Sequence, residues 1–124
     1  MKEWFIMNKE DRLNAIRKDL SNSNDILNAL CDNNRQKILL VLLDNCSDGG
    51  IRVIDIAKRV NLSRPAVSHH LKVLLDNNIV TIEHVGPMNF YHIAGLDKIL
   101  SLKSLLNNIE MYVKERNEEI KWRI

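Results

Sequence analysis

The chain has 124 residues and a formal net charge of +2, and 45% of its residues are hydrophobic. This length suits one domain, and the apolar fraction is sufficient for a core, although association helps a chain of this size. No apolar run approaches the roughly 20 residues of a membrane span, and the short segment Trp4–Met7 is no secretory leader. The sequence therefore predicts a cytoplasmic protein without a membrane partner.

The basic surplus of the chain is local. Residues 51–92 contain five Lys or Arg against three Asp or Glu, and all four histidines lie between 69 and 92. Residues 1–50 contain seven basic and eight acidic groups. A local surplus is typical of a surface that contacts nucleic acid, although ordinary surfaces often carry an excess of this size.

The first part of the chain predicts three helices. A helix over residues 8–20 has apolar residues on one face and charged residues on the other, and a short helix follows over 25–31. Asp32 is suited to cap a third helix that runs to about Asp44. Apolar residues cover nearly all sides of this third helix, which predicts a place at the centre of the core. Arg35, near its start, fits a surface salt bridge better than a phosphate contact.

The stretch from Leu62 to Asn78 carries the clearest helix signals. Ser63 is a favourable N-cap residue, Pro65 falls in the first turn, and the asparagines at 77 and 78 suit a left-handed turn that closes a helix. One face is apolar and predicted to be buried, and the other carries cations and hydrogen-bonding groups. The buried stripe comprises Val67, Leu71, Leu74 and Leu75, and the outer face comprises Arg64, Ser68, His69 and Lys72. A helix of this kind is suited to reading the major groove of DNA.

The neighbouring segments complete a winged helix-turn-helix. Ile54–Val60 is a short amphipathic helix, and the joint Asn61–Ser63 has the length that a helix-turn-helix uses. Downstream, the β-like runs Val80–Val85 and Phe90–Ile93 flank a hinge at Gly86–Asn89. The two runs predict a hairpin, the wing, directly after the helix that reads DNA.

Two further segments are predicted around this motif. Ile51–Val53 is expected to add a short strand to the sheet of the wing. From Leu96 to about Trp122, apolar residues recur at helical spacing, and a helix of that length extends about 39 Å. Its surplus apolar face predicts a homodimer, with Trp4 and Trp122 near the interface unless Trp122 belongs to a frayed tail.

Three runs carry a family resemblance: LSRPAVSHHLKVLLDNNIV, the upstream LCDNNRQKILLVLL and the hairpin EHVGPMNFYHI. Together they resemble the arsenical-resistance-repressor (ArsR/SmtB) family of bacterial transcription regulators, over roughly residues 26–110. The resemblance implies a mainly α (α+β) winged helix-turn-helix with a two- to three-stranded wing. It also implies one DNA-binding domain over 1–124, with a core at about 25–93 and dimerisation helices in 1–23 and 96–124.

We call the helix predicted over residues 62–78 the reading helix. In the two-fold dimer that the resemblance implies, its two copies enter successive major grooves about 34–36 Å apart, so the expected DNA site is an imperfect palindrome. Ser63 and Arg64 are placed for phosphates, because a helix N-terminus favours anions. Ser68 and His69 match the motif positions with which the family reads base edges. Lys72 is assigned either a base or a phosphate.

His70 and the wing are predicted to contact DNA less directly. His70 lies a third of a turn from the outer face, which favours packing or a backbone contact over base readout. Gly86 and Asn89, in the wing hinge, are expected to approach the adjacent minor groove. The hinge lacks the Arg or Lys that wings of this family often carry, which weakens its electrostatic contact.

The metal sites of the family have no counterpart here. Where relatives carry a cysteine pair, before the reading helix, this chain has Val53–Ala57 without thiols. On the last helix, where relatives supply Asp-x-His and His-x-x-Glu ligands, Asp97 is followed by Ile99, and Glu110 by Val113. Isoleucine and valine cannot bind a metal, so neither metal nor cofactor is predicted.

Two pairs of residues leave other signals open. Cys31 is expected on an apolar face and inert, whereas Cys46 is expected in a loop and more reactive. The pair would form a thiol switch if the fold brought them together. His84 and His92 are expected on the two wing strands and could face each other, but two histidines do not complete a zinc site.

The sequence therefore predicts a transcription regulator that binds double-stranded DNA as a homodimer, most simply a repressor released by an unidentified inducer. No glycine-rich phosphate loop or paired carboxylates indicate an enzyme. Two alternatives stay open: a winged helix that binds another protein, and a regulator without any inducer. The polar outer face of 62–78 argues against the first, since protein interfaces are less charged at their centres.

Overall fold

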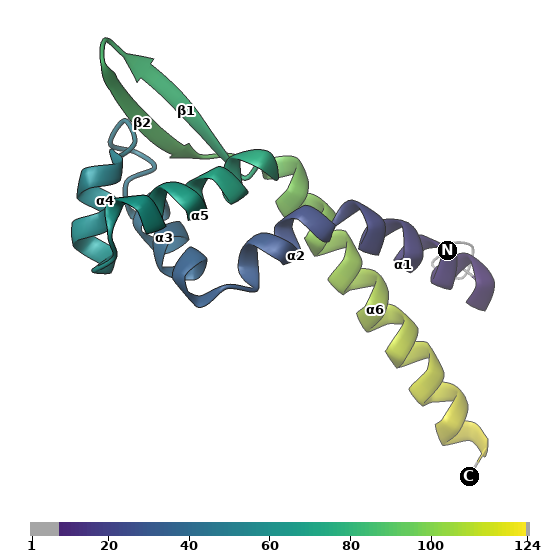
Figure 1. The fold of residues 1–124 in the computed structure, drawn as a ribbon. Coiled ribbons are helices and arrows are strands. Elements are labelled where there is room, and N and C mark those ends of the chain that lie inside the picture. The colour runs from purple at the N-terminus through teal and green to yellow at the C-terminus, as the bar shows by residue number, and fades with distance from the viewer. Residues whose placement is uncertain (1–7, 124) are drawn as a thin grey trace. The chain divides into compact units, whose positions relative to one another are not determined.

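The computed structural model describes residues 8–123, with side chains as far as Glu118 (Figure 1). The chain is mostly helical with one antiparallel hairpin, and the predicted winged helix-turn-helix is confirmed. Its elements are α1 (Lys9–Asn22), α2 (Asn24–Leu30), α3 (Asn33–Asp44), α4 (Val53–Val60), α5 (Arg64–Asp76), β1 (Val80–Val85), β2 (Met88–Ile93) and α6 (Leu96–Arg123). Two compact units result: Asp25–Leu96, and the remainder, which contains α1 and nearly all of α6.

Local capping determines where the helices begin. Asp32 Oδ1 accepts hydrogen bonds from the N–H groups of Asn34 and Arg35, at 2.8 and 3.0 Å, and α3 starts one residue later. The predicted cap of α5 is confirmed, because Ser63 Oγ accepts the N–H of Ala66 at 3.2 Å. At the other end of α5 only Asn78 is left-handed, with φ of 59°. Asn77 has φ of −95°, so the expectation of a left-handed conformation was wrong for Asn77.

The core of Asp25–Leu96 forms where α3, α4 and α5 pack together. Val67, Leu71 and Leu74 of α5 have no exposed surface, and Leu75 is half-buried. In α3, one face is buried through Ile38, Leu39, Val41 and Leu42. The predicted place of α3 at the centre of the core holds for this face only, because Leu40 and Leu43 of the same helix are 67% and 53% exposed.

Arg35 acts within this unit and holds α2 against the start of α3. Its Nε and NH2 groups donate to the backbone carbonyls of Ala29 and Asn28, at 3.3 and 3.0 Å. Its NH1 group lies 4.0 Å from Asp32 Oδ2, as the predicted salt bridge requires. The guanidinium therefore donates to carbonyls near the end of a helix that has no further turn whose N–H groups could do so.

The hairpin pairs β1 with β2 from Val80 opposite Ile93 to Val85 opposite Met88. Its turn is therefore shorter than predicted, with Gly86 at φ of 59° in the first central position, where a positive φ favours glycine. The predicted third strand is reduced to one bridge between Ile51 and Tyr91, because the next residue already begins the turn into α4. Gly50 is required beside this bridge, since a Cβ there would lie 2.7 Å from the His92 ring.

In the other unit, α1 and α6 run antiparallel and are joined by a polar network. Arg12 is 4% exposed and donates to Glu115 Oε1 at 3.0 Å and to Asn108 Oδ1 at 3.3 Å. Asp19 accepts from Asn108 Nδ2 at 2.7 Å and from Ser104 Oγ at 2.9 Å. A buried arginine on α1 was not predicted, because its partners lie about a hundred residues away.

α6 has 28 residues and extends about 42 Å. It buries Leu105, yet much of its apolar surface is open. The side chains more than a third exposed are Leu96, Ile99, Leu100, Leu106, Ile109, Met111 and Val113. Trp4 and the side chain of Trp122, predicted near a dimer interface, lie outside the described residues. Within the described part of the chain, no helix combines the length and hydrophobicity that a membrane span needs.

Arg12→Ala should lower the free energy of unfolding by about 2 kcal/mol, because it leaves Glu115 and Asn108 without their donor at a mostly buried site. Arg17→Ala is the matched control, since Arg17 lies on the same helix, is exposed and, among the described residues, bonds only Asn14. Its effect should stay below about 0.5 kcal/mol. Urea unfolding followed by circular dichroism measures both, and equal losses would show that the network is not a stabilising contact.

Candidate nucleic-acid interface

The outer face of α5 is presented to solvent as predicted. Arg64, Ser68, His69 and Lys72 are all exposed. None of the four side chains makes a hydrogen bond or ion pair within the described part of the chain; His69 only meets the His70 ring, at 5.6 Å between centroids. The buried stripe of the same helix fixes this orientation, so cationic and hydrogen-bonding groups project away from the core.

Ser63 combines a structural contact with a free donor. Its Oγ is occupied as an acceptor by the N–H of Ala66, which caps α5. A hydroxyl that accepts one hydrogen bond still has its proton to donate, so Ser63 can cap the helix and donate to a phosphate oxygen at once. Arg64 begins the helix immediately beside it.

His70 is turned toward α3 and is half-buried. Its Nδ1 is buried without a hydrogen-bond partner in the described part of the chain, and the ring lies near enough to Asp32, the cap of α3, to act on it electrostatically. The pKa of Asp32 is lowered, chiefly by the hydrogen bond from the Arg35 N–H, and a positive His70 acts in the same direction. This position agrees with packing rather than with base readout.

In the wing, Gly86 lies on the turn and Asn89 is the second residue of β2, and both are exposed. Asn89 Oδ1 lies 2.6 Å from His84 Nδ1, directly across the hairpin. His92 is opposite Thr81 and approaches Glu83 Oε1 at 3.3 Å. The expectation that the two wing histidines face each other is therefore wrong, because the register separates them.

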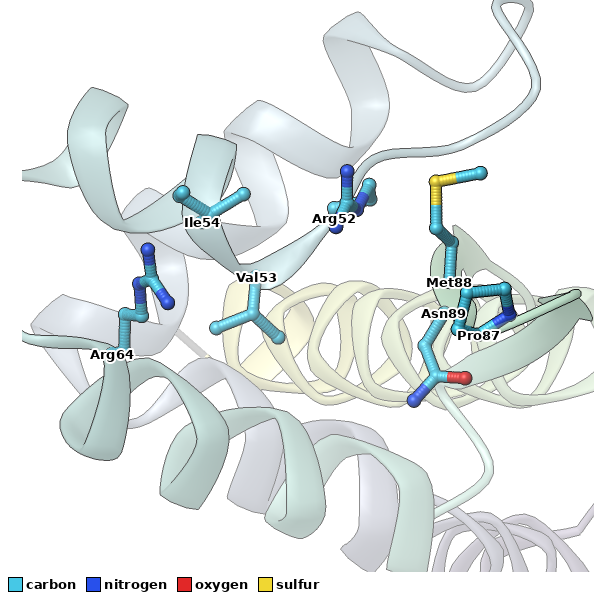
Figure 2. A pocket seen from close by; sticks show the side chains of 7 residues that line it. All are labelled: Arg52, Val53, Ile54, Arg64, Pro87, Met88 and Asn89. Atoms are coloured by element: carbon cyan, nitrogen blue, oxygen red, sulfur yellow. The ribbon is translucent and has the colours of Figure 1, made fainter.

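A pocket of about 210 Å³ lies between the starts of α4 and α5 and the wing turn. Figure 2 shows the side chains that line it, which are Arg52, Val53, Ile54, Arg64, Pro87, Met88 and Asn89. Arg52 is the N-cap residue of α4, but its side chain makes no capping hydrogen bond. Arg52 was given no role from the sequence, because a short strand was expected over Ile51–Val53. One feature of the sequence could have drawn attention to this position. Arg52 stands directly before α4, where Ser, Thr, Asp or Asn would normally cap the first N–H groups of the helix.

The two cysteines are placed so that they cannot pair within one chain. Both are exposed, so the expected burial of Cys31 was wrong. They lie at opposite ends of α3, whose 12 residues extend about 18 Å, whereas a disulfide needs Cα atoms within about 7 Å. Among the described residues, no group of three or more His, Cys, Asp or Glu side chains is arranged to bind a metal.

Known proteins share this arrangement. Residues 32–81 match the winged helix-turn-helix DNA-binding family. The arsenical resistance operon repressor of Staphylococcus aureus is 35% identical over 84 residues, which is 66% of this chain and 77% of that protein. The transcriptional repressor SdpR of Bacillus subtilis is 31% identical over 86 residues, which is 69% of this chain and 91% of SdpR.

Solved structures agree with these relatives. An ArsR-like transcriptional regulator from Rhodococcus sp. RHA1 shares the fold with a TM-score of 0.68, over 83% of this chain and 90% of that one, at 22% identity. Reduced HlyU from Vibrio cholerae N16961 gives a TM-score of 0.60 at 26% identity, over 73% and 90% of the two chains. The resemblance predicted from the reading helix and wing is confirmed, and the chain belongs to the arsenical-resistance-repressor (ArsR/SmtB) family of DNA-binding winged helix-turn-helix transcription regulators.

Proposed function

We propose that the protein represses transcription as a homodimer that occupies an imperfect palindromic operator and leaves it in response to a signal. The outward face of α5 carries this proposal, because four exposed polar side chains, without partners among the described residues, project from a helix whose other face buries Val67, Leu71 and Leu74 completely. A buried stripe of this kind gives the rigid support that base readout needs. The relatives that are named as repressors support repression rather than activation of transcription.

The contacts proposed for the DNA follow from position on α5. Ser68 and His69 lie in the second turn and are short enough to reach base edges in the major groove. Ser63 and Arg64, at the helix start, are assigned to phosphates, and Lys72 to a base or a phosphate. In the wing, Gly86 and Asn89 are assigned to the adjacent minor groove, and His70 to packing.

The dimer is proposed from the exposed surface of α6. Ile99, Leu102, Leu106, Ile109 and Val113 follow one another at alternating intervals of three and four residues, the spacing of a helix–helix seam. All of them are at least partly exposed, whereas Leu105, on another side of the helix, is buried. A second copy of the same face is self-complementary and removes this apolar surface from water.

The signal is proposed to differ from that of the relatives named for arsenical or cadmium resistance. The segment Val53–Ala57 contains no thiol, and Ile99 and Val113 stand where ligands of the last helix would be needed. A disulfide between Cys31 and Cys46 of one chain is excluded by the length of α3. The proposed inducer therefore acts elsewhere on the protein.

Selection of duplexes from a randomised library by the purified protein tests the central proposal. The expected result is an enriched imperfect palindrome whose half-sites are separated by about one helical turn, 10–10.5 base pairs, or a multiple of it. Enrichment of no sequence, together with equal affinity for all duplexes, would refute operator binding. That outcome would favour a winged helix that binds another protein.

His69→Ala should weaken binding to the selected duplex by about 1–3 kcal/mol at particular base pairs and leave other positions unaffected. Arg64→Ala and Lys72→Ala should weaken binding to all duplexes and lower the salt slope of log K by about one each. Fluorescence anisotropy with a panel of single-base variants of the duplex measures both effects. Equal losses on every duplex for His69→Ala would count against its role in reading bases.

The double substitution Leu106→Glu and Ile109→Glu should convert a dimer to a monomer of 14.4 kDa, because it buries two carboxylates in the proposed seam. Leu100→Glu is the control, since Leu100 is 53% exposed but lies on a different side of α6. Light scattering after size exclusion gives the mass of each variant. A wild-type monomer, or a double variant that remains dimeric, would refute this interface.

A further inference from the structure

Most arginines with described side chains are already engaged inside the protein. Arg12, Arg35 and Arg59 each pair with a carboxylate, Arg17 bonds Asn14, and Arg116 lies over the Tyr112 ring. Arg52 and Arg64 are different, because neither makes an ion pair or hydrogen bond within the described part of the chain. Both are exposed, and both line the same pocket (Figure 2). Two unpaired guanidinium groups at one concave surface indicate a ligand of negative charge.

The position of the pocket indicates where that ligand comes from. Its walls are the starts of α4 and α5 on one side and the tip of the wing on the other, where Pro87 of the turn and Met88 and Asn89 of β2 line it. When α5 lies in the major groove and the wing approaches the adjacent minor groove, one sugar–phosphate strand separates the two grooves. That strand must pass between α5 and the wing, which is the place where the pocket opens.

The groups at the pocket have the chemistry of a phosphodiester site. A guanidinium donates two parallel hydrogen bonds to phosphate oxygens, which a lysine cannot do. Val53 and Ile54 are the first residues of α4, so their N–H groups have no carbonyl within the helix, and the Arg52 side chain does not cap them. The start of α5 differs, because Ser63 already caps it.

We propose that Arg52 and Arg64 together bind one phosphodiester of the strand that runs between the reading helix and the wing. Arg52 thereby supplies the positive charge that the wing turn Gly86–Asn89 lacks. This site rests on the proposed operator binding and adds a contact from α4 that the sequence did not predict. Its role is to fix the register of the protein on the duplex, since phosphate contacts position without specifying sequence.

Salt dependence on the library-selected duplex gives the first test. Arg52→Gln should weaken binding about tenfold and reduce the slope of log K against log salt by about 0.9, the value of one phosphate contact. Arg52→Lys should keep the slope while losing part of the affinity, because the charge remains and the two-pronged geometry is lost. Lys58→Gln is the control, as it removes one charge from the opposite end of α4. Thermal unfolding midpoints should not change, because these side chains are exposed.

A scan with single neutral methylphosphonate linkages locates the contact. For the wild-type protein, one linkage in each half-site, between the major-groove bases and the adjacent minor groove, should weaken binding about tenfold when neutralised. For Arg52→Gln the same linkage should keep only the part of its effect that Arg64 contributes, and for the double variant Arg52→Gln and Arg64→Gln it should have no effect, whereas the other sensitive linkages keep theirs. A merely structural role of Arg52 would leave the pattern of sensitive linkages unchanged, which would overturn the proposal.

The outcomes separate this site from operator binding itself. If no duplex is selected, the proposed function fails. If a duplex is selected but Arg52→Gln behaves like Lys58→Gln, only the phosphodiester site fails. Inorganic phosphate, titrated at constant ionic strength without DNA, should bind in neither wild type nor variant below millimolar concentration. Tighter binding of phosphate that Arg52→Gln abolishes would show a site for a free anion and overturn the assignment to the DNA backbone.

Discussion

The burial of one side of α5 is the constraint on which the reading surface depends. Val67, Leu71 and Leu74 have no exposed surface, and burying each stabilises the fold by roughly 1.5–3 kcal/mol. Rotating the helix by one residue would turn these side chains outward and bury polar groups such as Ser68 without partners, at a further cost. The apolar side therefore determines which groups face the solvent, and sequence changes on the polar side can alter DNA specificity without altering the fold.

Net charge says little about the DNA surface of this protein; the arginines left unpaired say more. A total of +2 is weak for a nucleic-acid-binding protein. Three arginines are paired with carboxylates that hold elements together, as Arg59 pairs with Asp44 at 2.6 Å. Arg52, Arg64 and Lys72 are among the described cations without an ion pair, and they lie at the starts of two helices and along the outer face of α5. A modest global charge is thereby concentrated where α5 and the wing meet.

Local signals in the sequence predicted the helices and wing well, whereas contacts between distant elements were missed. The caps Asp32 and Ser63 bond N–H groups three residues further on, so the residue types at these positions are enough to predict them. The pairing of Arg12 with Glu115 joins helices from opposite ends of the sequence and leaves no local pattern. The wing histidines were misplaced because their places on neighbouring strands do not make them partners: the register of the hairpin pairs His84 with Asn89 and His92 with Thr81.

The division of the chain into two units suggests how binding to DNA can be controlled without a ligand at the reading surface. Every residue assigned here to DNA lies within Asp25–Leu96, whereas the proposed dimer seam lies on α6. Two reading helices bind one operator only if the dimer holds them about 34–36 Å apart. A ligand that prefers a dimer with another spacing therefore weakens operator binding. The affinity for DNA falls tenfold for each 1.4 kcal/mol by which the ligand binds that dimer better than the DNA-binding one. Such a signal needs no contact with α5, so the absence of thiols from Val53–Ala57 does not remove the capacity for regulation.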